Sequence, residues 1–190
     1  PHDEHCRRAL NEVAQAASAR THLLADPKAV KPQELASLAN ALSKLPDDGC
    51  CRQALNAVAR AVPARHRELA DPLHFNAPGL SNLANALSKL PDDGYCQNAL
   101  KAIARAVPSR TRELADPKDF DSQSLSTLAN ALRKLPDDGH CQDALQAIAR
   151  AASARARELA DSSEFNAQGL SILANALSKL PHDGYCQDAL

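Results

Sequence analysis

Aromatic residues are almost absent from this chain. It contains no Trp, two Tyr and three Phe among 190 residues, while 44% of its residues are hydrophobic. Ala and Leu therefore supply most of the apolar content, and both are strong helix formers. Because strands favour aromatic and β-branched residues, this composition excludes an all-β fold and predicts an all-α fold.

Long apolar runs and an excess of charge of either sign are absent as well. No apolar run approaches the ~18 residues that a membrane span needs, so we expect no membrane partner. The 22 basic and 23 acidic side chains give a formal net charge of −1, whereas a non-specific nucleic-acid binder would be more basic. The sequence starts at Pro1 without a signal peptide, and we expect it to be a fragment of a longer protein.

The pentapeptide Leu-Ala-Asn-Ala-Leu recurs every 45 residues, first at Leu38–Leu42 and last at Leu173–Leu177, and each copy runs through Lys-Leu into Pro. A cut before each Pro gives the units 1–45, 46–90, 91–135 and 136–180 and a partial fifth unit, 181–190. A fixed period of this length is typical of stacked helical units. We predict one domain, a monomeric right-handed α-solenoid of 45-residue helical repeats.

Each unit contains a first and a second helical segment. In the second unit, apolar residues from Cys51 to Val62 share one helix face. Pro63 and Pro108 follow, where Ser18 and Ser153 stand in the other units. Since Pro favours the first turn of a helix, we expect a kink there or a break into two short helices.

The second segment begins with a clear N-terminal signal. Asn76 is a good N-cap, and the flanking Phe75 and Leu80 have the spacing of a hydrophobic staple. Asp121 and Asn166 repeat this N-cap position. We expect each second helix to run to the Leu before the next Pro, where the turn sequence stops it.

Three rows of side chains remain on the exposed face of the second helices. The variable row is Ser37, Asn82, Thr127 and Ile172; the Asn row is Asn40, Asn85, Asn130 and Asn175; the Lys row is Lys44, Lys89, Lys134 and Lys179. A fourth row, the first-helix row, varies at the start of the first helices: His5, Cys50, Tyr95, His140 and Tyr185.

Variation at few positions within near-identical units is typical of a modular reader of single-stranded RNA. Short polar side chains of the variable row suit base edges, and His or Tyr of the first-helix row can stack on a base. One Lys per unit can meet one phosphate. On this interpretation the variable and first-helix rows read the ligand, and the Asn and Lys rows hold its backbone.

Structural interpretations of the same rows stay open. The variable row can reflect neutral drift on a solvated surface. The Asn side chains can bond the backbone of a neighbouring unit, and the Lys side chains can favour the C-terminal dipole of their own helix.

Other polar residues have structural interpretations. Arg20, Arg65, Arg110 and Arg155 are each followed six residues later by Asp, which predicts an ion pair within each unit. Arg60, Arg105, Arg150, Arg67, Arg112 and Arg157 have the pattern of a solvated outer face.

The Cys, His and Gly residues do not form catalytic or metal-binding motifs. One Cys per unit falls on the apolar face, as Cys6, Cys51, Cys96, Cys141 and Cys186. This spacing is not that of a zinc site and predicts buried thiols in a reducing compartment, with Cys50 as the exposed exception. The His residues lack ligand spacing, and no Gly-rich phosphate loop is present. We predict a protein that is not an enzyme and has no metal, cofactor or catalytic residue.

The run Ala-Leu-Ser-Lys-Leu-Pro at Ala41–Pro46, Ala86–Pro91 and Ala176–Pro181 resembles the signature of the SKWP repeat proteins. In this chain Leu45, Leu90, Leu135 and Leu180 stand in place of the signature Trp. Those proteins are type III secreted effectors of plant-pathogenic bacteria with HEAT/armadillo-like repeats. The resemblance implies secretion by a bacterial pathogen and action in the host cytoplasm, nucleus or an organelle.

The stretch Phe165–Leu170, followed by Leu173–Leu180, also resembles octotricopeptide repeats, which are α-solenoids implicated in organellar RNA binding. That resemblance favours single-stranded RNA as the partner. The armadillo likeness implies instead that the Asn row clamps an extended peptide of a host protein. Both partners remain open, with RNA slightly favoured.

Overall fold

A computed structural model describes residues 2–90, 92–136, 138–160 and 165–180. These residues form helices and no strand, so the prediction of an all-α fold is confirmed for them. The partial fifth unit, 181–190, and with it Tyr185 and Cys186, lie outside the described residues. The long first helices are α1 (His2–Ala19), α4 (Gly49–Ala61), α7 (Gly94–Ala106) and α10 (Gly139–Ala154). The second helices are α3 (Pro32–Leu42), α6 (Ala77–Leu87), α9 (Ser122–Leu132) and α12 (Ala167–Leu177).

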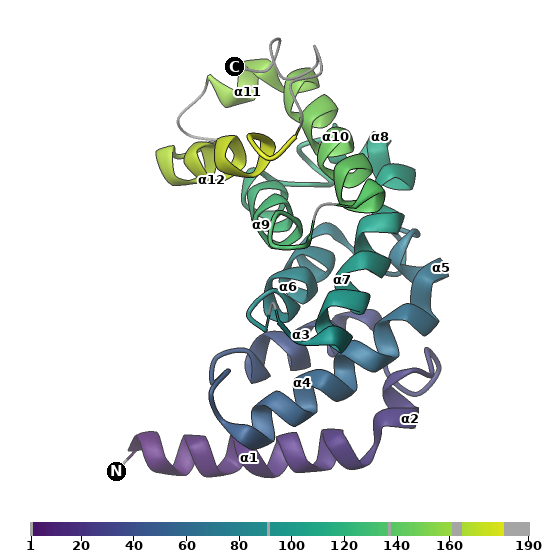
Figure 1. Cartoon of the computed structure of the whole chain (residues 1–190), viewed down its shortest axis with the longest axis vertical. Helices are drawn as coiled ribbons and strands as arrows, with labels where there is room; N and C mark the ends of the chain where they lie inside the picture. The colour runs from purple at the N-terminus through teal and green to yellow at the C-terminus, as the bar shows by residue number, and fades with distance from the viewer. Residues whose placement is uncertain (1, 91, 137, 161–164, 181–190) are drawn as a thin grey trace.

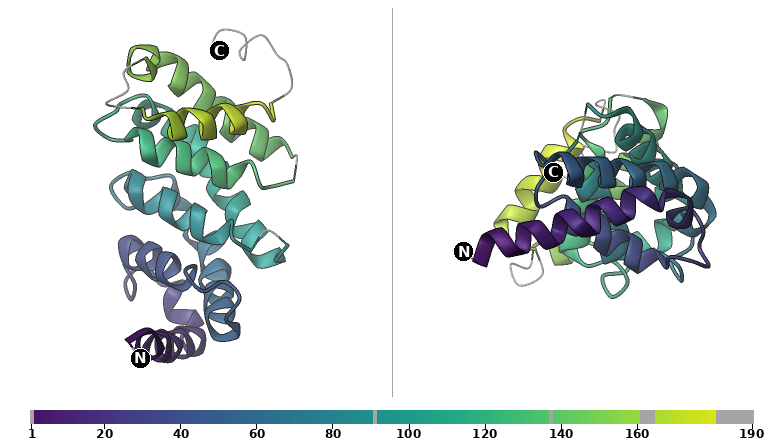
Figure 2. Two further views of the ribbon diagram at one scale, coloured as in Figure 1. Left: turned by 90° about the vertical axis from the view of Figure 1, so that its left-hand side faces the viewer. Right: turned by 90° about the horizontal axis from the view of Figure 1, so that it is seen from below.

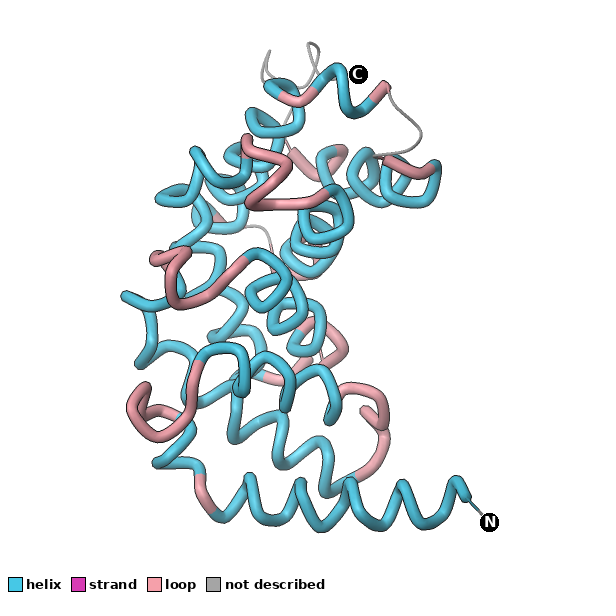
Figure 3. Tube along the Cα trace, turned by 180° about the vertical axis from the view of Figure 1, so that it is seen from behind, coloured by secondary structure: helices cyan, strands magenta, loops and turns pink. Residues whose placement is uncertain are grey.

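The long helices lie in two stacks (Figure 1). Each first helix packs on the first helix 45 residues later, and each second helix packs on its own successor. Figure 2 (left) shows the second helices one above another from α3 to α12. The connecting loops lie along the edges of the stacks, outside the helix contacts (Figure 3). Buried Leu, Ala, Val and Ile side chains fill the space between the stacks as one continuous core.

Short helical turns follow the first helices, and the prediction of a break at Pro is confirmed. Where Pro63 and Pro108 occur, the 3₁₀ turns η1 (Val62–Arg65) and η2 (Val107–Arg110) precede α5 (His66–Leu69) and α8 (Thr111–Leu114). Where Ser18 and Ser153 occur instead, α1 and α10 run on unbroken, before α2 (Thr21–Leu24) and α11 (Ala156–Leu159). Pro causes the break because it has no N–H and its ring clashes with a preceding carbonyl.

The predicted N-caps of the second helices are confirmed. The side chain of Asn76 accepts a hydrogen bond from the Gly79 amide at 2.9 Å, and Asp121 and Asn166 do the same for their own helices. The preceding residues Phe75, Phe120 and Phe165 are buried, as a hydrophobic staple requires. Local sequence alone therefore fixes where these helices begin.

The predicted ion pair between Arg65 and the Asp six residues later is wrong. The Arg65 guanidinium pairs instead with Glu68, at 2.6 Å, because residues three apart share one helix face. It also donates to the Leu24 carbonyl of the preceding unit. Arg110 repeats the pattern in the third unit, and its guanidinium is 2% exposed. These Arg side chains thus link neighbouring units.

The Cys residues follow the prediction in the interior and depart from it at the first unit. Cys51, Cys96 and Cys141 are buried. Cys6 is exposed, contrary to the prediction, because none of the described helices covers it on α1. Cys50, predicted to be exposed, is half-buried.

No group of three or more His, Cys, Asp or Glu in the described part of the chain could hold a metal ion. No helix in that part is long and apolar enough to cross a membrane.

Candidate ligand-binding face

The variable row and the Asn row lie on the surface of the second helices. Ser37 and Asn82 are exposed, and Thr127 and Ile172 are half-buried. In the Asn row, Asn40, Asn85 and Asn130 are half-buried and Asn175 is exposed. This face is the candidate ligand-binding face, because each unit contributes one residue of each row to it.

A pocket of about 360 Å³ opens on this face between α9 and α12. Thr127 and Ile172, the variable residues of neighbouring units, both line it. Its other walls include Gln123, Ser126, Phe165 and Gln168. The volume falls within the range of small-ligand sites, and the amide and hydroxyl groups can fix the orientation of a planar polar ligand.

Small residues lie on the same face where the second helices pack. A Cβ atom added at Gly79 would lie 2.8 Å from the Oδ1 atom of its N-cap residue Asn76, and at an ordinary contact distance of 4.0 Å from the Ala36 methyl group of α3. Between α6 and α9 the Ser81 hydroxyl donates a buried hydrogen bond of 2.8 Å to the Ser124 carbonyl. These positions and the Gln side chains of the pocket were not predicted from the sequence, although Gly, Ala and Ser recur beside the variable row.

The Lys row bonds the ends of the preceding second helices. The Lys89 ammonium donates to the carbonyl of Ser43 at 3.0 Å, and that of Lys134 donates to the carbonyl of Ser88 at 3.3 Å. Lys179 donates to the carbonyls of Arg133 and Leu135. Carbonyls at a helix C-terminus lack intrahelical partners and carry negative partial charge, so a cation is favourable there. The helix end belongs to the preceding unit, whereas the structural interpretation expected the lysine's own helix.

The lysines lie close enough together to perturb one another. Burial lowers the pKa of Lys89, and the Lys44 charge lowers it further. Burial also lowers the pKa of Lys134, with contributions from Arg133 and Lys89. Lys44, Lys89 and Lys134 therefore form a line of neighbouring positive charges. An ammonium has three donors and Lys89 uses one of them on the end of α3, so donors remain there for an anionic ligand.

The side chains of the Asn row make fewer hydrogen bonds than those of the Lys row. The Asn130 side-chain oxygen accepts a hydrogen bond from the Arg133 guanidinium at 2.9 Å. The side-chain amides of Asn40, Asn85 and Asn175 make no hydrogen bond within the part of the chain that the structure describes. The predicted bond from Asn to the backbone of a neighbouring unit is not seen there.

Two members of the first-helix row, Cys50 and Tyr95, contact the preceding first helix. The Arg60 guanidinium lies 4.0 Å from the centroid of the Tyr95 ring, which is 45% exposed. The Cys50 sulfur accepts a long hydrogen bond from Gln15. His5 and His140 are exposed. No contact among the described residues brings this row together with the variable row.

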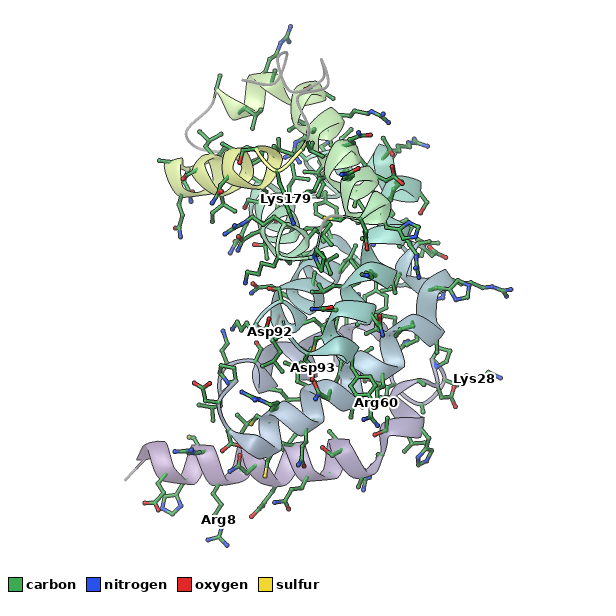
Figure 4. All side chains as sticks on the ribbon, viewed as in Figure 1. Arg8, Lys28, Arg60, Asp92, Asp93 and Lys179 are labelled. Atoms are coloured by element: carbon green, nitrogen blue, oxygen red, sulfur yellow. The ribbon has the colours of Figure 1, made fainter. Side chains whose placement is uncertain are left out.

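The turn before each first helix carries structural carboxylates. Asp48 caps α4 by accepting from the amides of Cys50 and Cys51, and this bonding, led by that of Cys51, lowers its pKa. Asp93 caps α7 and also accepts from the Asn56 amide of α4 at 3.0 Å. In Figure 4 Asp93 lies at the start of α7, whereas Arg8 and Lys28 point away from the molecule. These Asp residues therefore belong to the scaffold.

Comparisons with known proteins gave no match to any family model, curated protein or solved structure.

Proposed function

We propose that this chain is a non-enzymatic α-solenoid that binds single-stranded RNA on the face of its second helices. The observation that carries the proposal is the pocket between α9 and α12, whose walls contain the variable residues of two successive units, Thr127 and Ile172. A base held between two such residues is read by a pair of side chains, as in other helical RNA readers.

The Lys row supports the same proposal. It supplies one ammonium per unit, which suits a phosphate backbone. Lys44 and Lys134 are exposed, whereas Lys89 and Lys179 are half-buried.

The test is selection of a randomised single-stranded RNA pool at near-physiological salt, followed by affinity measurements on the enriched sequence. Lys44→Gln is the cleanest variant, because no hydrogen bond from its ammonium to the described residues would be lost. We expect this variant to bind more weakly and to reduce the salt slope by about 0.7, the value for one phosphate on a single strand.

Arg105→Gln is the matched control, since it removes one exposed positive charge from the first helices. Equal loss of affinity in both variants would show unspecific attraction and would contradict the proposed face. Ile172→Asn should change the enriched base at one position only. Failure to enrich any motif would reject RNA reading.

A second candidate function is the binding of an extended peptide. The observation that favours it is the lack of side-chain hydrogen bonds at Asn40, Asn85 and Asn175 within the described residues, because such amides can bond a peptide backbone. A paired variant, Asn40→Ala with Asn85→Ala, would then abolish capture of a host-protein peptide. The proposal that the chain is a secreted bacterial effector related to the SKWP proteins goes with this candidate.

A further inference from the structure

The pocket between α9 and α12 has a side-chain amide on each of its two helices. Gln123 of α9 and Gln168 of α12 both line it, at the same position of successive units. Both side chains are exposed, and neither makes a hydrogen bond within the part of the chain that the structure describes. Two amide groups are therefore available to a ligand, one from each helix.

The two earlier junctions between second helices lack this pair of amides. Pro78 of α6 takes the equivalent position, so the junction of α3 with α6 has Gln33 and Pro78, and the junction of α6 with α9 has Pro78 and Gln123. A proline ring offers no side-chain donor or acceptor. Among the junctions between the described second helices, the paired amides thus belong to that of α9 with α12.

Packing at the same junction leaves room for a ligand. Between α6 and α9 the Ser81 hydroxyl donates to the Ser124 carbonyl of the next helix. Between α9 and α12 the equivalent hydroxyl, of Ser126, donates to the Gln123 carbonyl of its own helix at 3.1 Å. Gly169 stands where α9 has Ser124, and a Cβ atom added there would lie 3.9 Å from the Ser126 hydroxyl oxygen. The missing side chain therefore keeps one wall of the pocket open.

Apolar side chains supply the rest of a site for a flat ligand. Phe165 and Ile172 line the pocket beside the two amides. Apolar walls with a few convergent polar groups suit a planar, partly polar ligand such as a nucleobase. The axes of packed helices lie about 8–10 Å apart, so a side chain as long as Gln can reach the edge of a base from each helix.

Two amides distinguish among the four bases of RNA. An amide binds an edge that has an acceptor beside a donor, since its NH₂ group donates and its oxygen accepts. Adenine has such a pair twice, N1 with N6–H on the Watson–Crick edge and N7 with N6–H on the Hoogsteen edge. On the Hoogsteen edge guanine has acceptors only, and cytosine and uracil have a carbon beside their exocyclic group. Adenine is therefore the base that satisfies an amide on both of these edges.

We propose that this pocket selects adenine, with Gln123 and Gln168 as the residues that determine the specificity. The inference rests on the proposed function, because it assigns the adenine to a nucleotide of single-stranded RNA whose phosphates contact the Lys row. One amide binds N6 and N7 of the base, and the other binds N6 and N1. Thr127 and Ile172 of the variable row then form walls of the pocket, while the discrimination between bases comes from the Gln pair.

Selection of a randomised RNA pool by the 190-residue chain and its variants tests the inference. The wild type should enrich a motif with adenine at one position, and any other base there should weaken binding about tenfold or more. Gln123→Met and Gln168→Met should remove the preference at that position alone, because Met keeps the length of the side chain without its amide. Gln33→Met is the matched control and should leave the preference unchanged, since Pro78 supplies no second amide at its junction.

A further variant fills the pocket without a change to either Gln. Gly169→Ser introduces the residue that α9 has at the same position, Ser124. Its Cβ atom would lie 3.4 Å from the nearest neighbour, the Asn166 Oδ1 atom, which is an ordinary contact, so the helix should form. This variant should also lose the preference for adenine, while its circular dichroism spectrum stays that of the wild type.

Base analogues at the selected adenine separate the two edges. 7-Deazaadenine lacks the N7 acceptor, and purine lacks the N6 amino group, so each should weaken binding to the wild type. In one of the two Gln→Met variants 7-deazaadenine should bind as well as adenine, because the amide that contacts N7 is already absent there. An equal penalty for 7-deazaadenine in the wild type and in both variants would contradict the assignment.

The outcomes separate this inference from the proposed function. An enriched motif without a selected adenine, or one that the Gln variants leave unchanged, overturns the inference while the proposed function stands. Failure to enrich any motif rejects both. Adenosine monophosphate alone should compete only weakly with the RNA, since it lacks the further phosphates that contact the Lys row. Binding of this free nucleotide as tight as that of the RNA would overturn the assignment to RNA.

Discussion

The ammonium of Lys89 donates a hydrogen bond to the carbonyl of Ser43 across 46 positions of sequence, from one unit to the C-cap of the preceding second helix. The same bond joins Lys134 to Ser88, the C-cap of α6. A side chain that from sequence reads as a ligand contact is thus also a connection between units. Substitutions in the Lys row therefore bear on stability as well as on the proposed RNA binding.

Replacement of Lys89 by Met should lower the free energy of unfolding by about 1 kcal/mol, the usual contribution of one hydrogen bond. The C-terminal carbonyls of α3 would lose both a donor and a favourable charge. Urea denaturation followed by circular dichroism measures the change.

Lys44→Met is the control for this change. The Lys44 ammonium makes no hydrogen bond to the described residues, so its replacement should alter the stability of this chain by less than about 0.5 kcal/mol. Equal destabilisation by the two variants would mean that the bond to Ser43 contributes nothing.

Replacement of Arg110 by Met should be far more costly, at about 3 kcal/mol, because it leaves Glu113 and two carbonyls of the preceding unit without their donor. Arg110→Lys should recover only part of the loss, since an ammonium cannot reproduce the planar fork of the guanidinium. Thermal and urea unfolding should show that Arg110→Met is the least stable, with Arg110→Lys between it and the wild type.

Arg112, in the same turn of helix, is the control for Arg110. It is exposed, and Arg112→Met should leave stability nearly unchanged. A stable Arg110→Met variant would show that the guanidinium does not hold the units together.

The parts of the fold that the sequence predicted correctly are those set by local rules. Pro63 ends α4, and Asn76 with Phe75 begins α6, because each signal acts within one turn of helix. The Glu68 partner of Arg65 was missed although it is local, three residues away. The contacts of Arg65 and Lys89 with the preceding unit were missed for a different reason. Near-identical units offer the same residue at 45-residue intervals, and sequence alone does not tell a contact within a unit from one between units.

The candidate site likewise has features set by local sequence and features set by packing between units. The helical period placed Asn82 and Asn85 correctly at the surface. The pocket beside Thr127 was not predictable, because it depends on the approach of α9 and α12 and on the sizes of residues such as Ser126 and Gly169. Both the pocket and the approach of the two helices depend on packing between segments 45 residues apart.

Acid should destabilise the start of the first helices. The pKa of Asp48 is lowered chiefly by the Cys51 amide, and that of Asp138 chiefly by the Cys141 amide. A carboxyl whose folded-state pKa lies below its unfolded value of about 3.9 stabilises the fold fully above that value. The stabilisation is lost as the pH falls through the folded-state pKa.

Asp138→Asn keeps a capping oxygen but cannot titrate at this site. Its melting temperature should therefore fall less steeply than that of the wild type between pH 5 and pH 2, a window of about three units around the carboxyl range. Asp47→Asn is the control, because Asp47 is exposed and lies beside the cap instead of in it. Identical pH profiles for wild type and Asp138→Asn would contradict the capping role.

Thiol reactivity should separate Cys96 from Cys6 in the folded protein. Burial, aided by the Asp93 charge, raises the pKa of Cys96 to about 12, so at pH 8 roughly one molecule in ten thousand carries the reactive thiolate there. Cys6 is exposed. Iodoacetamide at low protein concentration should modify Cys6 much faster than Cys96, as measured by peptide mass spectrometry. In urea the two rates should converge, because the difference arises from the packing of α7 on α4 and α10. Comparable rates in the native protein would mean that α7 separates from its neighbours often enough to make Cys96 as accessible as Cys6.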